Sequence, residues 1–247
     1  MKRWAFLLFS LLWIGCASTP PPIQNEGEVR YKLGISYLGE GDYASALREL
    51  LKGVEREPRK AEIHNALGLA YYSLERLEEA EKEFQGALNL SPKFTEAYNN
   101  LGAVYLKEER WGEAIEVFQK VTTDLTYSRP EVPLTNIGFA YQSQGELIKA
   151  ITYYDQAIRY NPKYDVAYLN RGLAYKGLRR LDNAVNDLQK VVELRSDSAQ
   201  AYYDLGLVRK DQQEEKKAIE AFQKVVEIGN PQDLVDKAQR EIQLLTR

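Results

Sequence analysis

Residues 61–80 read AEIHNALGLAYYSLERLEEA, and residues 95–114 read TEAYNNLGAVYLKEERWGEA, so one pattern returns after 34 positions. In both stretches a Gly is followed by a Tyr three residues later and by an Ala twelve residues later. A fixed period of this length is the sequence signature of a repeat architecture. The period therefore decides the fold, ahead of any local propensity.

Three columns of residues extend this period along most of the chain. Neighbouring members of the Gly column are 34, 34, 36, 34 and 34 residues apart, and the Ala column keeps the same spacings. The Tyr column, three residues after each Gly, is broken only by Arg209. The Gly column comprises Gly34, Gly68, Gly102, Gly138, Gly172 and Gly206. The Ala column comprises Ala46, Ala80, Ala114, Ala150, Ala184 and Ala218. The Tyr column comprises Tyr37, Tyr71, Tyr105, Tyr141 and Tyr175.

Each period predicts two amphipathic helices that cross where their residues are small. Gly and Ala allow the close approach, and the aromatic side chains fill the space beside the crossing. Pro58, Pro92 and Pro162 each follow a column Gly by 24 residues, where one helix must end before the next begins. We therefore predict six repeats, with the boundaries 27–60, 61–94, 95–130, 131–164, 165–198 and 199–232.

A single helix pair cannot bury its apolar stripe, so neighbouring repeats should stack around a continuous core. The last segment, residues 233–247, carries Leu234, Ala238, Ile242 and Leu245 at helical spacing. This segment predicts a capping helix at the end of the stack.

The columns resemble those of the tetratricopeptide repeat family over almost the whole chain beyond its first residues. The resemblance implies an all-α fold, a right-handed α-α superhelix (solenoid) of six tetratricopeptide repeats followed by the C-terminal capping helix. It also implies a scaffold that binds other proteins.

Composition argues against several other classes of protein. Lys+Arg 33 and Asp+Glu 36 give a net charge of -3, and both signs are mixed along the chain, unlike the basic face of a nucleic-acid-binding protein. Cys16 is the only Cys and His64 the only His, so common zinc sites and nucleophilic triads lack most of their parts. We expect no catalytic residues, no metal, no cofactor and no nucleic acid, and we interpret His64 as an inter-helix packing residue.

The N-terminus has the features of a secretory signal peptide. Lys2 and Arg3 precede an apolar run over residues 4–14 in which only Ser10 is polar. The run is too short for a membrane span, which needs about 20 apolar residues. We therefore predict a signal peptide over residues 1–15.

Residues 12–16 read LWIGC and resemble the bacterial lipobox, with Gly15 at its small position and Trp13 where Leu is usual. The resemblance implies lipidation of Cys16, palmitate included, and acyl chains would anchor the protein firmly. Ala17, rather than Asp, implies sorting to the outer membrane, facing the periplasm. Residues 16–26, which include a run of three prolines, would form an extended tether.

In tetratricopeptide arrays the first helix of each repeat lines the concave face. The residue after each column Gly is apolar throughout, and the residue three positions further on is apolar in the first three repeats but polar in the last three. Contiguous apolar surface usually marks an interaction site, so we predict a groove for a peptide or helix. The alternative is that neighbouring helices cover these side chains. The predicted groove comprises Ile35, Leu38, Asn65, Leu69, Tyr72, Asn99, Ala103, Leu106, Phe139 and Leu173.

Asparagines near the middle of the first helices leave two interpretations open. Their amides could read a ligand, or they could hydrogen-bond to backbone groups along the groove. The residues concerned are Asn65, Asn99, Asn100, Asn136 and Asn170.

The third repeat is two residues longer than the others, and residues 122–138 read TTDLTYSRPEVPLTNIG, where prolines and threonines should interrupt the helix. This insertion, the six repeats and the lipobox together resemble the type IV pilus biogenesis lipoproteins called pilotins. The resemblance implies binding of an outer-membrane secretin subunit, through an amphipathic segment, to help localise and assemble it.

Two other functions remain open from the sequence. A general cell-envelope adaptor could use the same scaffold to dock peptidoglycan hydrolases or an outer-membrane assembly machine. A glycan-processing or glycan-binding enzyme could use carboxylates of the groove, although solvated Glu and Asp on helix faces explain these residues more simply.

Overall fold

The computed structural model describes residues 25–246 and folds this range into thirteen α-helices with no strand. The predicted all-α solenoid is confirmed, while the predicted signal peptide and the predicted lipid site at Cys16 lie outside the described residues. The helices are α1 (Glu26–Glu40), α2 (Tyr43–Arg56), α3 (Ala61–Ser73), α4 (Leu77–Leu90), α5 (Thr95–Lys107), α6 (Trp111–Thr122), α7 (Glu131–Ser143), α8 (Leu147–Tyr160), α9 (Asp165–Gly177), α10 (Leu181–Leu194), α11 (Ala199–Asp211), α12 (Glu215–Ile228) and α13 (Gln232–Leu245).

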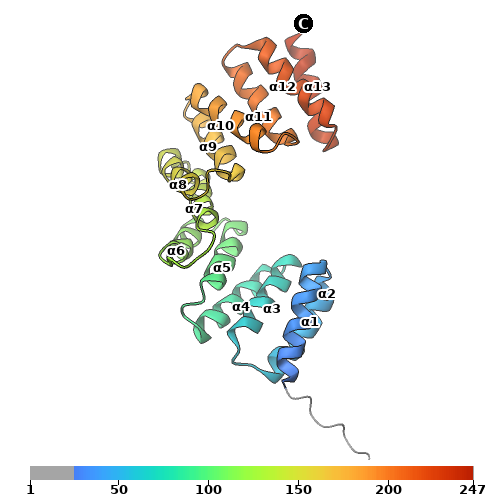
Figure 1. The fold of residues 1–247 in the computed structure, drawn as a ribbon, viewed down its shortest axis with the longest axis vertical. Helices are drawn as coiled ribbons and strands as arrows, with labels where there is room; N and C mark the ends of the chain where they lie inside the picture. Colours follow the sequence, from blue (N-terminus) through green and yellow to red (C-terminus); the bar gives the residue numbers. More distant parts are fainter. Residues whose placement is uncertain (1–24, 247) are drawn as a thin grey trace, which may run out of the picture.

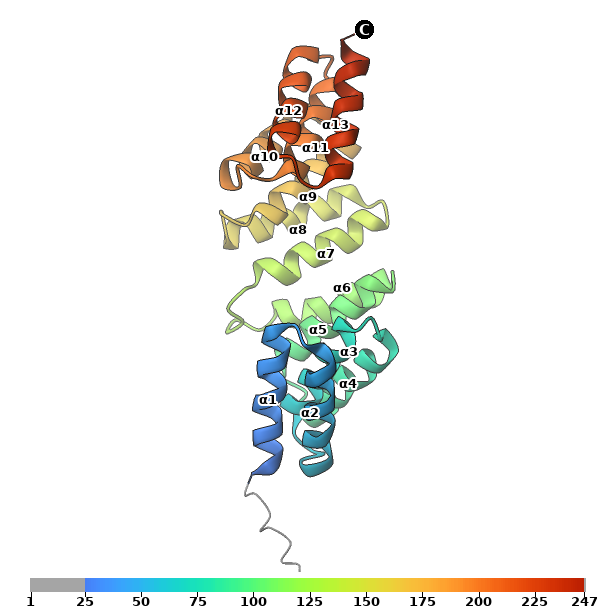
Figure 2. The same ribbon diagram turned by 90° about the vertical axis from the view of Figure 1, so that its right-hand side faces the viewer.

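The helices stack in chain order into an open arc (Figure 1). Each helix packs against the next, and each odd-numbered helix also contacts the next odd-numbered one. The even-numbered helices make no such contacts with one another within the described range. The odd-numbered helices therefore form the inner, concave side of the arc, and the even-numbered helices form its outer side. The view in Figure 2 shows the successive hairpins as layers along the long axis.

The column glycines lie where the two helices of a repeat cross. In four repeats an aromatic ring of the second helix lies directly over the Gly of the first. A Cβ added to Gly102 would stand 2.6 Å from the Phe118 ring, and one added to Gly138 would stand 2.5 Å from the Tyr154 ring. Real carbon atoms do not approach this closely, so the rings fit only because these positions have no side chain.

The Ala column is fully buried, and the Tyr column packs beside it. All six column alanines have no exposed surface, and the column tyrosines are buried or half-buried against the core clusters. The clusters follow one another from α2 to α13, so the core runs the length of the stack. This continuity is what the stacking of incomplete repeats requires.

The two-residue insertion of the third repeat is absorbed in the connection between α6 and α7. Asp124 holds this loop by accepting hydrogen bonds from the Thr126 backbone N–H (2.9 Å) and hydroxyl (2.6 Å). The expected interruption by prolines is confined to this loop. Pro133 lies in the first turn of α7, where its missing N–H needs no partner.

The C-terminal helix α13 covers the last repeat. Leu234 and Ala238 are buried in one cluster with Phe222 and Val225 of α12. The side of α13 that faces away from the stack carries exposed charged residues such as Lys237. Of the helices described, none has the length and apolar character that a membrane span would require.

The ring-over-glycine contact predicts a stability difference between two column positions. Replacing Gly102 with Ala should lower the free energy of unfolding by about 1 kcal/mol, because overpacking costs ~1–3 kcal/mol and the better helix propensity of Ala returns less than that. Gly172→Ala is the matched control, since its added Cβ would find its nearest atoms at 3.3 Å. Denaturant unfolding measures both variants, and an equal loss in the two would contradict the contact.

Candidate functional site

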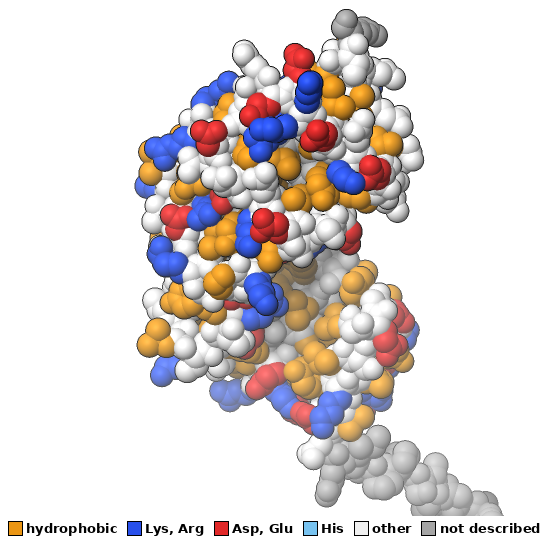
Figure 3. Space-filling model, turned by 45° about the horizontal axis from the view of Figure 1, so that its top comes forward, with side chains coloured by type: hydrophobic (Ala, Val, Ile, Leu, Met, Phe, Trp, Pro, Cys, Tyr) orange, Lys and Arg blue, Asp and Glu red, His pale blue; other side chains and the backbone are white. Residues whose placement is uncertain are grey.

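The residues that follow the column glycines lie on the concave side of the arc. Ile35 on α1 and Phe139 on α7 are the most open of them, with exposed fractions of 41% and 39%. Leu69, Ala103 and Leu173 are half-buried on α3, α5 and α9. Figure 3 shows hydrophobic side chains on the walls of the hollow that the arc encloses.

The second line of predicted groove residues is partly covered. Leu38 packs against the cluster of the first two repeats, while Tyr72 and Leu106 pack against the cluster that contains Phe84 and Phe118. All three side chains remain half-buried rather than buried. Neighbouring helices therefore fix these side chains from one side and leave part of each side chain in contact with solvent.

One asparagine of the predicted groove, Asn65, is engaged within the fold. Asn100 Nδ2 donates a hydrogen bond to Asn65 Oδ1 (3.0 Å), and this bond joins α5 to α3. Asn99 Oδ1 and the Thr135 hydroxyl are buried without a hydrogen-bond partner among the described residues. Asn65 thus makes a side-chain pair between helices, which neither interpretation of the asparagines anticipated.

Trp111, the first residue of the outer helix α6, supports the candidate site through its contact with Phe139, although the sequence analysis did not select it. Its ring meets the Phe139 ring edge-on, with the centroids 6.0 Å apart, and it packs with Tyr72 and Leu106 on the same core cluster. The available signal was its place in the repeat, where Leu77 stands in the preceding unit. Aromatic anchors of this kind carry much of the binding energy at protein interfaces.

Lys107 adds a positive charge next to these aromatic residues. Its Nζ lies 5.1 Å from the centroid of the Tyr72 ring and 2.6 Å from Glu75 Oε1. The hydrogen bond to Glu75 raises the pKa of Lys107 further above its already basic ordinary value. Its position on a ring face stabilises the Tyr72 side chain in the orientation that lines the hollow.

The C-terminal half of the concave side is polar and internally paired. The Tyr154 hydroxyl donates to Gln142 Oε1 (2.9 Å), and Lys210 Nζ lies 2.6 Å from Glu241 Oε2. Burial raises the pKa of the Asp204 carboxyl, against a hydrogen bond from Gln200 and the charge of Lys176. The line of apolar residues after the column glycines thus continues to Leu173 on α9, whereas the neighbouring line becomes polar at Gln142 on α7.

His64 lies between the two helices of the second repeat. Its Nδ1 is 2.7 Å from Glu83 Oε2 and its Nε2 is 3.0 Å from the Pro58 carbonyl oxygen. These contacts join α3 to α4 and to the loop before α3, as expected for an inter-helix packing residue. Across residues 25–246 there is no group of three His, Cys, Asp or Glu side chains placed to hold a metal ion.

Family models match most of the described chain. Models described as tetratricopeptide repeat match residues 31–93 and 169–233, a second match of the same description covers residues 97–132, and one described as TPR repeat covers residues 136–178. The chain therefore belongs to the tetratricopeptide repeat family. Membership of this family indicates a protein-interaction scaffold.

Among solved structures, the chain is similar to two proteins of pilus biogenesis and to a peptide-binding repeat protein. PilW, described as a widely conserved type IV pilus biogenesis factor, aligns with a TM-score of 0.78 and 19% identity over 90% of this chain and 98% of that one. PilF of Pseudomonas aeruginosa aligns with a TM-score of 0.75 and 17% identity, over 88% of this chain and 98% of that one.

The third structure is YrrB, described as a TPR protein with an unusual peptide-binding site. It aligns with a TM-score of 0.59 and 22% identity over 77% of this chain and 97% of that one. At these identities the three likenesses establish a shared fold. No curated protein matches the sequence.

Proposed function

We propose that this protein is an outer-membrane lipoprotein scaffold that faces the periplasm and supports type IV pilus biogenesis. Its concave groove would bind an outer-membrane secretin subunit and help to localise and assemble it. The observation that carries the proposal is the line of partly exposed apolar side chains from Ile35 to Phe139. The structural similarity of the chain to PilW and PilF, which covers most of its length, supports the choice of pilus biogenesis.

The groove suits an amphipathic segment of the partner. Burying apolar surface there would contribute about 25 cal/mol per Å², less the cost of ordering the segment. Tyr72, Trp111 and Phe139 are already held by packing, so little of their own freedom is lost on binding. A groove whose side chains are set in advance binds more tightly than one that must be ordered by its ligand.

The dimensions of the groove limit the segment it can hold. The apolar half crosses four odd-numbered helices, α1 to α7, and helices in contact lie roughly 10 Å apart. Three such steps give about 30 Å, which corresponds to a helix of about 20 residues or an extended segment of about nine. A partner segment of this size with one apolar face meets the requirement.

The lipid anchor is proposed from the sequence of the first residues. Acylation of Cys16 would hold the scaffold at the membrane, and the following residues would let the stack reach a partner in the same membrane. The anchor and the groove are separate parts of the proposal and need separate tests.

Truncating two groove anchors should weaken capture of the secretin. In the variant Leu69→Ala with Leu106→Ala, the affinity for the secretin in native envelopes should fall about thirtyfold, because the two anchors are expected to contribute roughly 1 kcal/mol each. Quantitative mass spectrometry of proteins that co-purify with the scaffold measures the resulting loss of secretin recovery.

The matched control carries Leu90→Ala and Ile148→Ala, two exposed apolar side chains of the outer helices α4 and α8. This control should capture the secretin as the unaltered protein does. Unchanged recovery in the groove variant would remove the groove assignment. Recovery of peptidoglycan hydrolases or an assembly complex in place of a secretin would favour the general envelope adaptor.

Removing the acylated thiol should release the protein from the membrane. Cys16→Ala should move the protein from the outer-membrane fraction to the soluble periplasmic fraction, because the acyl chains supply the anchor. Membrane fractionation with detection of the protein measures the shift. A variant that still fractionates with the outer membrane would overturn the lipid anchor and leave the groove untouched.

A further inference from the structure

The one break in the Tyr column, Arg209, lines a pocket on the other side of the stack. In the second and third repeats the column tyrosine carries an Arg on its ring face, with Arg76 4.7 Å from Tyr71 and Arg110 4.2 Å from Tyr105. In the sixth repeat both partners are exchanged, and Arg209 takes the place of the Tyr while Glu214 takes the place of the Arg. Arg209 Nη1 lies 2.5 Å from Glu214 Oε2.

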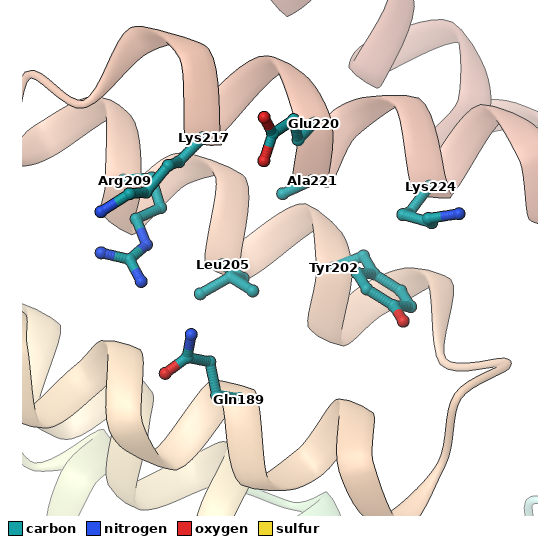
Figure 4. A pocket seen from close by; sticks show the side chains of 8 residues that line it. All are labelled: Gln189, Tyr202, Leu205, Arg209, Lys217, Glu220, Ala221 and Lys224. Atoms are coloured by element: carbon teal, nitrogen blue, oxygen red, sulfur yellow. The ribbon is translucent and has the colours of Figure 1, made fainter.

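The pocket beside Arg209 has a volume of about 270 Å³ and lies between α10, α11 and α12 (Figure 4). Leu205 and Ala221 are among its apolar lining residues, and both are almost fully buried. A space of this size can hold one or two side chains.

Three cations border this pocket. Arg209, Lys217 and Lys224 line it together with a single acidic residue, Glu220. Figure 4 shows Arg209 and Lys217 near one end of the pocket and Lys224 near the other, beside the Tyr202 ring. A ligand over the apolar surface would therefore have a positive charge within reach at either end.

The equivalent pocket three junctions earlier has the opposite charge. It lies against α4, α5 and α6, with Tyr105 in the place of Arg209 and Glu113 in the place of Lys217. Glu116 adds a second acid there, and Lys120 is its only cation. The chain thus contains two pockets at equivalent positions of the repeat, and their charges differ. The repeat pattern therefore does not explain why the pocket beside Arg209 is basic.

The lysines of the basic pocket are available to a ligand. Lys217 pairs with Glu214 (3.0 Å) and Lys224 with Glu227 (2.5 Å), and the side chains of both lysines are more than half exposed. Exposed pairs of this kind contribute little, so either lysine can turn to an incoming carboxylate at low cost. Arg209, with a side chain only 15% exposed, stays fixed as part of the pocket wall.

We propose that this pocket, between α10 and α12, is a second protein-docking site that takes a peptide segment with an acidic residue beside a large apolar residue. The apolar side chain would cover Leu205 and Ala221, and the carboxylate would meet Lys217 or Lys224. The site lies apart from the predicted groove, because none of its lining residues belongs to that groove. The inference therefore does not depend on the proposed secretin binding.

Fluorescence anisotropy with a rhodamine-labelled peptide of sequence Gly-Glu-Glu-Phe-Gly tests the proposal on the full-length protein in detergent. We expect saturable binding that weakens with added salt, and no saturable binding of the Gly-Lys-Lys-Phe-Gly peptide. Lys217→Glu together with Lys224→Glu should weaken binding of the acidic peptide at least tenfold. Both side chains are more than half exposed, so exchanging their pairs with Glu214 and Glu227 for like charges should lower the thermal midpoint of unfolding only slightly.

Lys120→Glu, in the equivalent acidic pocket, is the matched control and should bind the peptide as the unaltered protein does. Equal binding of the two peptides, no saturable binding of either, or full binding by the double variant would each overturn the site. Displacement of the peptide by inorganic phosphate at equal concentration would assign a simple anion site and contradict peptide docking. The groove variants keep Lys217 and Lys224, so they should bind the acidic peptide whether or not they capture the secretin. Failure of the proposed secretin binding can therefore be distinguished from failure of the proposed peptide site.

Discussion

The contact of an aromatic ring with a glycine, repeated along the stack, is the constraint on which the fold depends. At Gly68, Gly102, Gly138 and Gly206 a ring of the second helix fills the space that a Cβ would need. This contact sets how closely the two helices of a repeat approach each other. It therefore also sets the orientation in which one helix pair packs against the next helix pair. Because the same crossing recurs, the odd-numbered helices form one continuous concave side.

The repeat period predicts the fold because it records these crossings directly in the sequence. It also placed Ile35 and Phe139 on the concave side, since residues one position after each glycine share one face of successive helices. The pair between Asn65 and Asn100 could not be predicted, because it depends on the offset between α3 and α5. Trp111 was missed because it begins a second helix, and only the three-dimensional stack brings it against Phe139.

The same scaffold supports two surfaces of different chemistry. The concave side is more apolar over its first repeats because Leu38, Tyr72 and Leu106 lie there. The corresponding positions of the last three repeats carry Gln142, Lys176 and Lys210, and Lys210 pairs with Glu241. At the junction of α10 and α12, Lys217 stands where the third repeat has Glu113 and Arg209 stands where it has Tyr105, and these replacements leave a basic pocket. Departures from the repeat therefore point to function more directly than the repeat itself does.

The central claim is that the concave side between α1 and α7 holds a segment of a secretin. A photoreactive amino acid placed at position 139 and activated in intact envelopes tests this claim most directly, with position 148 on the outer helix α8 as the reference. The account predicts a covalent adduct with a secretin subunit from position 139 and none from position 148. An adduct with a secretin from position 148 alone, or from neither position, would contradict it.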